Sequence, residues 1–190
     1  MNVLVTAIGS MSAQAVIKSL RKIIDGKING CDIYHEKWLP SRRLVDGFRT
    51  VPHPAEVDRY ICFLLDLCRE WQINFLVPLT DPEVDILSGF SDDFYAQGVS
   101  ITVSPQWCIK IVRDKQELFE RLAGFAEVKM IPTYALKTCT ESDALTFPAL
   151  AKPRKGRSSE GLFRLSSRCD VDLLLNNPAY RDHIRHYQKQ

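Results

Sequence analysis

A basic segment between two glycines, directly after an apolar stretch, contains the residues of this sequence that are best suited to chemistry. The segment PALAKPRKGRSSEG covers residues 148–161, and its cations are Lys152, Arg154, Lys155 and Arg157. Gly156 and Gly161 permit positive φ and close backbone approach, and Ser158 and Ser159 add hydroxyl groups. Backbone N–H groups in such a loop can converge on a polyphosphate, which needs both hydrogen bonds and neutralising charge. The segment therefore predicts a phosphate-binding loop, which Lys152 reaches from the end of the preceding strand.

The same segment has a simpler interpretation as a solvated basic hairpin, because runs of charge are usually exposed faces. It is not a Walker loop, since the pattern G-x-x-x-x-G-K-[ST] does not occur in the sequence. The residues of the segment alone leave both interpretations open, and the choice depends on the rest of the chain.

The overall composition is that of an ordinary globular protein. The 190 residues are 45% hydrophobic and 25% charged, and the formal net charge is +2, so the sequence predicts no general affinity for nucleic acid. Met1 leads directly into NVLVTAIG without the basic start of a signal peptide, and no apolar run approaches the length of a membrane span. The six cysteines form no CxxC pair. We therefore expect a cytoplasmic protein with mostly buried thiols and no membrane partner.

Short apolar strands alternate with amphipathic helices over the first part of the chain. The expected strands are VLV at 3–5, CDIY at 31–34, residues 48–51, INFLVPLT at 73–80 and VSITVS at 99–104. One expected helix follows the first strand, and a second runs from about residue 56 to 70. Two more helices begin at Asp81-Pro82 and at Ser104-Pro105. This alternation predicts an α/β fold with a parallel, doubly wound, Rossmann-like sheet, and a ligand site at the carboxyl ends of its strands.

The pattern changes after residue 112, so we expect two domains, 1–112 and 113–190. Asp114 is the expected cap of the helix in DKQELFERLAG, and DVDLLLNN is a second short helix. The pieces VKMIPTY, ALAKP and LFRL are typical of strands. This second part is too small for a complete α/β domain, and we interpret it as a partial α+β lobe.

The chain resembles the N-terminal part of ATP-grasp enzymes, in the branch of the carbamoyl-phosphate synthase large subunit and the small carboxylate–amine ligases. The resemblance covers nearly the whole chain and rests on segments that occur in this order: VLVTAIGS, VDGFRTVPHP, INFLVPLTDPEVDIL, GVSITVSP, IVRDKQELFERL and FPALAKPRKGRSSEG. It implies a pre-ATP-grasp domain over residues 1–112 and the first, incomplete ATP-grasp lobe over residues 113–190. It also implies an ATP-dependent ligase that acts through an acylphosphate and uses Mg²⁺.

The resemblance also implies the residues of a nucleotide site. Lys115 matches a cation that touches nucleotide phosphates, and Lys152 matches a lysine that contacts the α/β-phosphate region. The loop from Gly156 to Gly161 matches a flexible loop that closes over the β- and γ-phosphates. The candidate cofactor-binding residues are therefore Lys115, Lys152, Gly156, Arg157, Ser158, Ser159 and Gly161.

Three departures from the family pattern shape the expected function. Glu160 places a carboxylate inside the phosphate loop, the stretch before FPALAKP is short, and the sequence given stops at Gln190. The family's Mg²⁺-binding acidic residues and its catalytic arginine lie in a later lobe. We therefore assign no catalytic residue or metal ligand here, and expect a truncated or split protein that is inactive alone. It would work with a missing C-terminal lobe, in cis or in trans, and with a small carboxylate substrate, and a homo-oligomer is possible.

Two other functions remain open at this stage. The first is a non-catalytic Rossmann-like module for binding or assembly, with a basic loop that is merely surface. The second is an NAD(P)-binding protein, which Gly9 suggests, although AIGSMSAQ lacks the G-x-G-x-x-G pattern. Asp81 and Glu83 follow the end of an expected strand, where sites in open sheets often lie, but an ordinary helix cap explains them equally well.

Overall fold

The structure is a computed structural model that describes residues 1–136, 145–156 and 161–177. The chain divides into two compact units, Met1–Ile109 and Lys110–Gln190. This division lies inside the helix Gln106–Arg113, close to the boundary at 112 that the sequence suggests. Each unit is described by itself. Among the residues described, no helix has the length and apolar character needed to cross a membrane.

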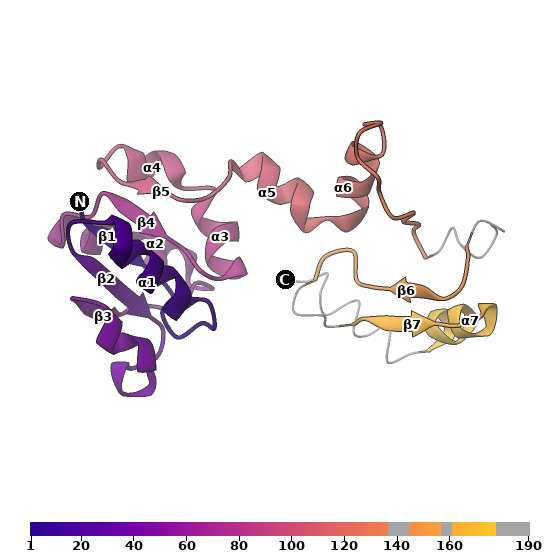
Figure 1. The fold of residues 1–190 in the computed structure, drawn as a ribbon, viewed down its shortest axis with the longest axis horizontal. Helices are drawn as coiled ribbons and strands as arrows, with labels where there is room; N and C mark the ends of the chain where they lie inside the picture. The colour runs from indigo at the N-terminus through magenta and orange to yellow at the C-terminus, as the bar shows by residue number, and fades with distance from the viewer. Residues whose placement is uncertain (137–144, 157–160, 178–190) are drawn as a thin grey trace. The chain divides into compact units, whose positions relative to one another are not determined.

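The N-terminal unit is built on a five-stranded parallel sheet (Figure 1). Its strands are β1 (Val3–Val5), β2 (Ile28–Asp32), β3 (Phe48–Thr50), β4 (Phe75–Val77) and β5 (Ser100–Ile101). They lie in the order β3-β2-β1-β4-β5, and every neighbouring pair is parallel. From β1 the chain first adds β2 and β3 on one side of the sheet and then adds β4 and β5 on the other side. The topological switch point therefore lies between β1 and β4. The expected parallel, doubly wound α/β fold is confirmed.

Helices connect the strands and cover both faces of the sheet. They are α1 (Ala13–Ile23), the 3₁₀ helices η1 (Glu36–Trp38) and η2 (Pro40–Leu44), α2 (Val57–Glu70), α3 (Asp81–Leu87), α4 (Ser91–Tyr95) and α5 (Gln106–Arg113). Alternate residues of β1 point to opposite faces, as the two-residue period of a strand requires. Val3 and Val5 pack with α1, whereas Leu4 packs with α2, α3 and α4. The two faces therefore have separate hydrophobic cores.

Two element boundaries differ from those expected from the sequence. Strand β2 begins at Ile28, three residues before the expected CDIY, and all five of its residues are buried. Asn29-Gly30 is a turn-like pair in sequence, but Gly30 is needed for close packing, since a Cβ there would lie 2.8 Å from Ile8 Cγ2. Helix α3 is capped by Thr80 rather than Asp81, because Thr80 and Glu83 form a capping box.

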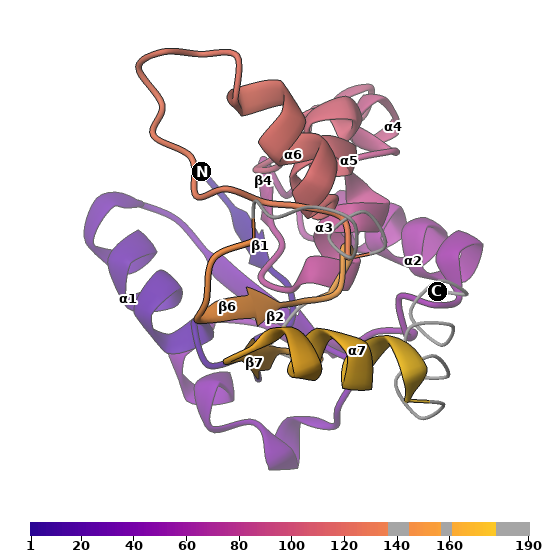
Figure 2. The same cartoon turned by 90° about the vertical axis from the view of Figure 1, so that its right-hand side faces the viewer.

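The C-terminal unit contains α6 (Lys115–Leu122), the antiparallel strands β6 (Ala149–Ala151) and β7 (Phe163–Leu165), and α7 (Arg168–Asn176). Figure 2 shows α7 alongside the β6–β7 pair. Leu165, Val171 and Leu174 form the buried core of this small assembly. The expected strand at VKMIPTY is wrong, since residues 128–134 lie in irregular backbone. Pro132 interrupts that run, and proline cannot donate to a strand ladder.

The cysteines divide into buried and exposed groups. Cys31 and Cys68 are buried, whereas Cys62 and Cys169 are exposed. Burial raises the pKa of Cys68 to about 12 and also raises the pKa of Cys31. The expectation of mostly buried thiols is therefore wrong for Cys62 and Cys169. Cys139 lies outside the described residues.

Candidate nucleotide-binding site

Asp114 organises the start of α6 in the C-terminal unit. Its carboxylate is buried, and Oδ1 accepts hydrogen bonds from the backbone N–H groups of Gln116 and Glu117, both at 3.2 Å. The expected N-cap is thus confirmed. These bonds satisfy two of the free N–H groups that every helix start presents.

Arg154 ties the basic segment after β6 to this helix start. Its Nε donates to both Asp114 oxygens, at 2.5 and 2.6 Å, and its carbonyl accepts from the backbone N–H of Lys115 at 3.1 Å. The Arg154 guanidinium lowers the pKa of Asp114 against the opposing effect of burial. One of the four clustered cations therefore has a structural partner, and its role is to fix the segment that follows β6.

Two of the residues singled out in the sequence, Lys115 and Gly156, are in direct contact. The Lys115 ammonium donates to the Gly156 carbonyl at 3.0 Å, although the residues are 41 positions apart. Burial lowers the pKa of Lys115, and the nearby positive charge of Lys152 lowers it further. The two lysines are therefore close enough to repel each other, while Lys152 itself is exposed directly after β6.

The basic segment connects β6 to β7, with Ala151 paired to Phe163. Gly161 has a φ of 67°, a left-handed conformation that favours glycine, as the sequence suggests. Gly156 does not use the positive φ that glycine permits, and a Cβ there would lie 3.2 Å from Pro153 Cβ, which is a close approach. Arg157, Ser158 and Ser159 lie outside the described residues, as does Glu160.

This arrangement has the electrostatic properties of an anion site. Burial is the main cause of the lowered pKa of Lys115, and the positive charge of Lys152, from a distant part of the chain, lowers it further. An anion bound between the two lysines would remove their repulsion and gain charge-assisted hydrogen bonds. The Asp114–Arg154 pair holds both the α6 start and the β6–β7 connection in place. Sequence reasoning missed this pair, because nothing local links residues 40 positions apart.

The Asp114–Arg154 pair should make the C-terminal unit sensitive to acid. Because the pKa of Asp114 is lowered in the folded state, the ionised carboxylate stabilises the fold fully at pH values above its unfolded-state pKa of about 3.9. That contribution is lost as pH falls through the lower, folded-state pKa. Hydrogen exchange of the Gln116 and Glu117 amides should therefore speed up below about pH 4 relative to other amides of α6. Asp114→Ala should remove this pH dependence and cost about 1 kcal/mol through loss of the cap; an unchanged acid response would contradict this role.

The carboxyl edge of the N-terminal sheet is held by a buried aspartate. Asp32 ends β2, and its two oxygens accept the backbone N–H groups of Gly9 at 2.8 Å and Tyr34 at 3.0 Å. A Cβ on Gly9 would lie 2.8 Å from Leu39 Cδ2 and 3.1 Å from Asp32 Oδ2. Gly9 is therefore explained by close packing on Asp32. In a dinucleotide site the acidic residue binds ribose, whereas here Asp32 accepts backbone N–H groups; the absence of the G-x-G-x-x-G pattern from AIGSMSAQ remains the argument against the NAD(P) alternative.

Glu83 is the second buried carboxylate at this edge. Its Oε1 accepts the Tyr60 hydroxyl at 2.8 Å, and its Oε2 accepts the hydroxyl and backbone N–H of Thr80 at 2.7 and 3.2 Å. Burial and the neighbouring Glu83 charge raise the pKa of Tyr60. Glu83 is only 4% exposed. A role in the helix cap therefore explains this carboxylate better than a role in a ligand site.

An open hollow of about 570 Å³ lies beside the Gly9 loop. Residues from the loop, α1 and η2 line it, namely Gly9, Ser10, Met11, Gln14, Ala15, Lys18, Pro40 and Ser41. Ser12 occupies the N-cap position of α1 but makes no side-chain cap bond. Within the described parts of the chain, no three His, Cys, Asp or Glu side chains gather into a possible metal site.

A family match and the similar structures together support an N-terminal part of the ATP-grasp type, with its pre-ATP-grasp sheet. The biotin carboxylase domain of 2-oxoglutarate carboxylase from Hydrogenobacter thermophilus, a dimer solved with MgADP, ADP and bicarbonate, is similar with a TM-score of 0.70 and 16% identity. The Campylobacter jejuni biotin carboxylase, solved as a β-γ-ATP complex, is similar with a TM-score of 0.66 and 12% identity, and the L-amino acid ligase from Bacillus licheniformis with a TM-score of 0.62 and 13% identity. These alignments cover 98%, 89% and 95% of this chain.

The chain belongs to the family described as "PylC-like, N-terminal domain", whose model matches residues 3–102. That match covers more than half of the 190 residues and includes all five strands of the parallel sheet. A comparison with curated protein sequences gives no match. The chain spans about two fifths of the three similar structures, that is 42%, 39% and 41% of their lengths.

Proposed function

We propose that this chain supplies the phosphate-binding part of the ATP site of a ligase that joins a carboxylate to an amine. The contact between the Lys115 ammonium and the Gly156 carbonyl, with Lys152 beside it, carries this proposal. It brings together three residues that the family resemblance assigned to nucleotide binding. Family membership and the fold of the similar structures support a protein of the ligase type.

The proposed chemistry is transfer of a phosphoryl group from ATP to a carboxylate, followed by attack of an amine on the acylphosphate. Mg²⁺ bridges the phosphates in such reactions, and the protein mainly positions groups and neutralises charge. Lys115 and Lys152 neutralise phosphate oxygens, and backbone N–H groups of the residue 156–161 loop, with Arg157, Ser158 and Ser159, close over them. The nucleotide-bound similar structures support ATP and Mg²⁺ as cofactors.

We assign the Mg²⁺ ligands and the catalytic groups to a further ATP-grasp lobe, joined to this chain or supplied by another protein. The limited share of the similar structures that this chain spans supports that arrangement. We further propose the carbamoyl-phosphate synthase-like branch, a cytoplasmic location, inactivity of these 190 residues alone, and domains at 1–112 and 113–190. A homo-oligomer is a further proposal, which the dimeric Hydrogenobacter thermophilus domain supports.

Titration with a non-hydrolysable ATP analogue and Mg²⁺, followed by amide chemical shifts in NMR, tests the proposed site. Binding should shift the amide signals of Lys115, Lys152 and Gly156. Lys115→Ala and Lys152→Ala should each raise the dissociation constant at least about tenfold, a loss of about 1.4 kcal/mol, since each removes a charge-assisted phosphate contact.

Lys129→Ala is the matched control, because Lys129 is an exposed lysine of the same unit and is not one of the residues assigned to the nucleotide site. This variant should bind the analogue as tightly as the natural chain. Equal loss of affinity in all three variants would reveal general charge attraction. Absence of any shift at Lys115 and Lys152 up to millimolar analogue would favour the non-catalytic binding or assembly module instead.

A further inference from the structure

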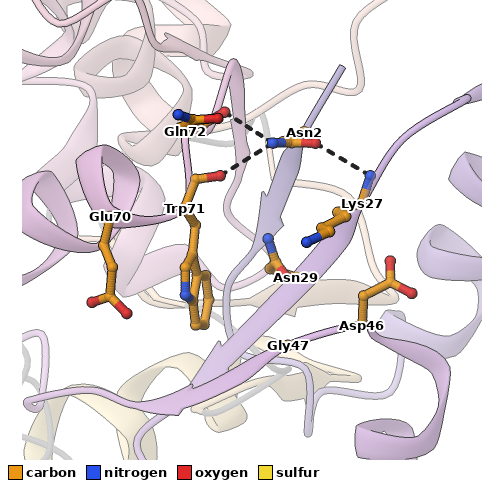
Figure 3. Close-up of a pocket in the computed structure, with 8 residues that line it drawn as sticks. All are labelled: Asn2, Lys27, Asn29, Asp46, Gly47, Glu70, Trp71 and Gln72. Carbon is orange, nitrogen blue, oxygen red and sulfur yellow. Dashed lines mark hydrogen bonds between the residues drawn. The ribbon is translucent and has the colours of Figure 1, made fainter.

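A polar cavity of about 330 Å³ lies in the N-terminal unit at the amino ends of the strands (Figure 3). Its wall comprises residues that precede β1, β2 and β3, one residue of β2 and the end of α2, namely Asn2, Lys27, Asn29, Asp46, Gly47, Glu70, Trp71 and Gln72. It lies at the opposite edge of the sheet from Gly9, Asp32 and Thr80. Cavities of this size accept small ligands.

The side chain of Asn29 lines this cavity without a partner. Asn29 is only 4% exposed, and among the residues that the structure describes none forms a hydrogen bond with its carboxamide. A carboxamide offers two donors and an acceptor, and buried polar groups almost always have a partner. Among the described residues, Thr6 Oγ1 is the only side-chain polar atom that is both fully buried and without a partner, so the Asn29 carboxamide is open to the cavity. A ligand in the cavity can therefore reach its donors and its acceptor.

Gly47 lies directly against the side chain of Asn29. A Cβ at Gly47 would lie 2.7 Å from Asn29 Oδ1 and 3.7 Å from Trp71 Cζ2. Its φ is not in the left-handed region, so backbone conformation does not require glycine there. Any side chain at this position would crowd the carboxamide and take up room beside the indole ring.

The indole ring of Trp71 forms part of the cavity wall, and its surroundings restrict its position. The Arg49 guanidinium lies 5.5 Å from its ring centroid, and Arg49 is itself paired with Glu70 at 2.5 Å. Asn2 Nδ2 donates to the carbonyls of Trp71 and Gln72, at 3.1 and 3.2 Å, as the dashed lines in Figure 3 show. A ring fixed by both backbone and cation contacts is suited to stacking.

The charges around the cavity favour an anionic group on the ligand. Asp46 is paired with Arg21 at 2.9 Å and accepts the backbone N–H of Ile28 at 2.7 Å, and these contacts, with the nearby charge of Lys27, lower its pKa against the effect of burial. Glu70, the other carboxylate of the cavity wall, is paired with Arg49. A cationic ligand would therefore meet only carboxylates that already have cationic partners, whereas the three N–H donors of the Lys27 ammonium can bind an anionic substituent.

We propose that this cavity binds a planar heterocycle of the nucleobase type, which carries a donor and an acceptor side by side. The ring edge pairs with the Asn29 carboxamide, as asparagine pairs with base edges elsewhere. The ring face lies against Trp71, and a phosphate attached through a sugar reaches Lys27. This site is independent of the nucleotide site proposed above, because all of its residues belong to the N-terminal unit.

NMR titration of the whole chain with uracil, with uridine 5′-monophosphate and with 1,3-dimethyluracil tests this proposal. Uracil should shift the Asn29 side-chain N–H signals and the Trp71 indole N–H, and the monophosphate should bind at least about fivefold more tightly through Lys27. Dimethyluracil has no N–H donor and should shift neither signal. Absence of shifts at Asn29 and Trp71 with uracil and the monophosphate, or equal shifts with dimethyluracil, would overturn the proposal.

Variants make the assignment specific. Gly47→Ala should abolish the uracil-induced shifts by crowding the Asn29 carboxamide, while Gly124→Ala, where a Cβ would meet nothing within 4 Å, should leave them unchanged. Lys27→Ala should bring the affinity for the monophosphate down to that for uracil. If Asn29→Ala lowers stability, the Gly47 and Lys27 variants still decide the outcome. The Lys115→Ala and Lys152→Ala variants should leave the shifts at Asn29 unchanged, so failure of one proposed site is distinguishable from failure of the other.

Discussion

Replacement of Glu83 by alanine should lower the free energy of unfolding of the N-terminal unit by about 3 kcal/mol. The carboxylate is 4% exposed and accepts the Tyr60 hydroxyl and both donors of Thr80. Its removal leaves a buried phenol and the start of α3 without their acceptor, and the penalty for charged hydrogen bonds exceeds that for neutral ones. Urea denaturation followed by circular dichroism measures the change.

Two further variants serve as references for the size of the expected loss of stability. Tyr60→Phe removes one bond of the network and should cost about 1 kcal/mol. Asp66→Ala, on the exposed side of α2, removes a surface pair with Arg69 and should change stability by less than about 0.5 kcal/mol. A Glu83→Ala loss no larger than the Asp66→Ala loss would show that the buried network contributes nothing to stability.

Asp32→Ala should cost about 2–3 kcal/mol and loosen the loop after β1. Asp32 accepts the N–H groups of Gly9 and Tyr34, which lie on two different connections at the carboxyl edge. Without these bonds, hydrogen exchange at the Gly9 and Tyr34 amides should become much faster than exchange within β1 itself. Asp32→Asn keeps one carbonyl acceptor and should lose about half as much. Unchanged protection of Gly9 in the alanine variant would refute the bridging role.

Much of the parallel sheet could be predicted from the sequence, because its strands are short apolar runs separated by helices of clear period. The errors have local causes. Strand β2 contains Asn29 and Gly30, both of which favour turns in isolation, and only packing against Ile8 explains the glycine. The helix start at Thr80 was placed one residue late, because Asp81 is also a good cap. Such choices depend on tertiary contacts that a single sequence does not contain.

The candidate site could be predicted less completely. The sequence pointed to Lys115, Lys152 and Gly156, and the structure brings them together within the C-terminal unit. It did not reveal that Arg154 is bound to Asp114, since local pattern carries no information about a pair 40 positions apart. The position of the Asn29 carboxamide in a cavity wall could not be predicted either, because the fold alone decides which polar groups line a cavity.

The position of β1 has a consequence for how the protein is made. This strand precedes both of its neighbours in the chain but belongs at the centre of the sheet, with β2 on one flank and β4 on the other. One flank is therefore without its partner until Val77 has been synthesised. During that interval its backbone groups and apolar side chains can associate with other nascent chains. Slower translation of the segment between β1 and β4 should therefore increase aggregation, and faster arrival of β4 should reduce it.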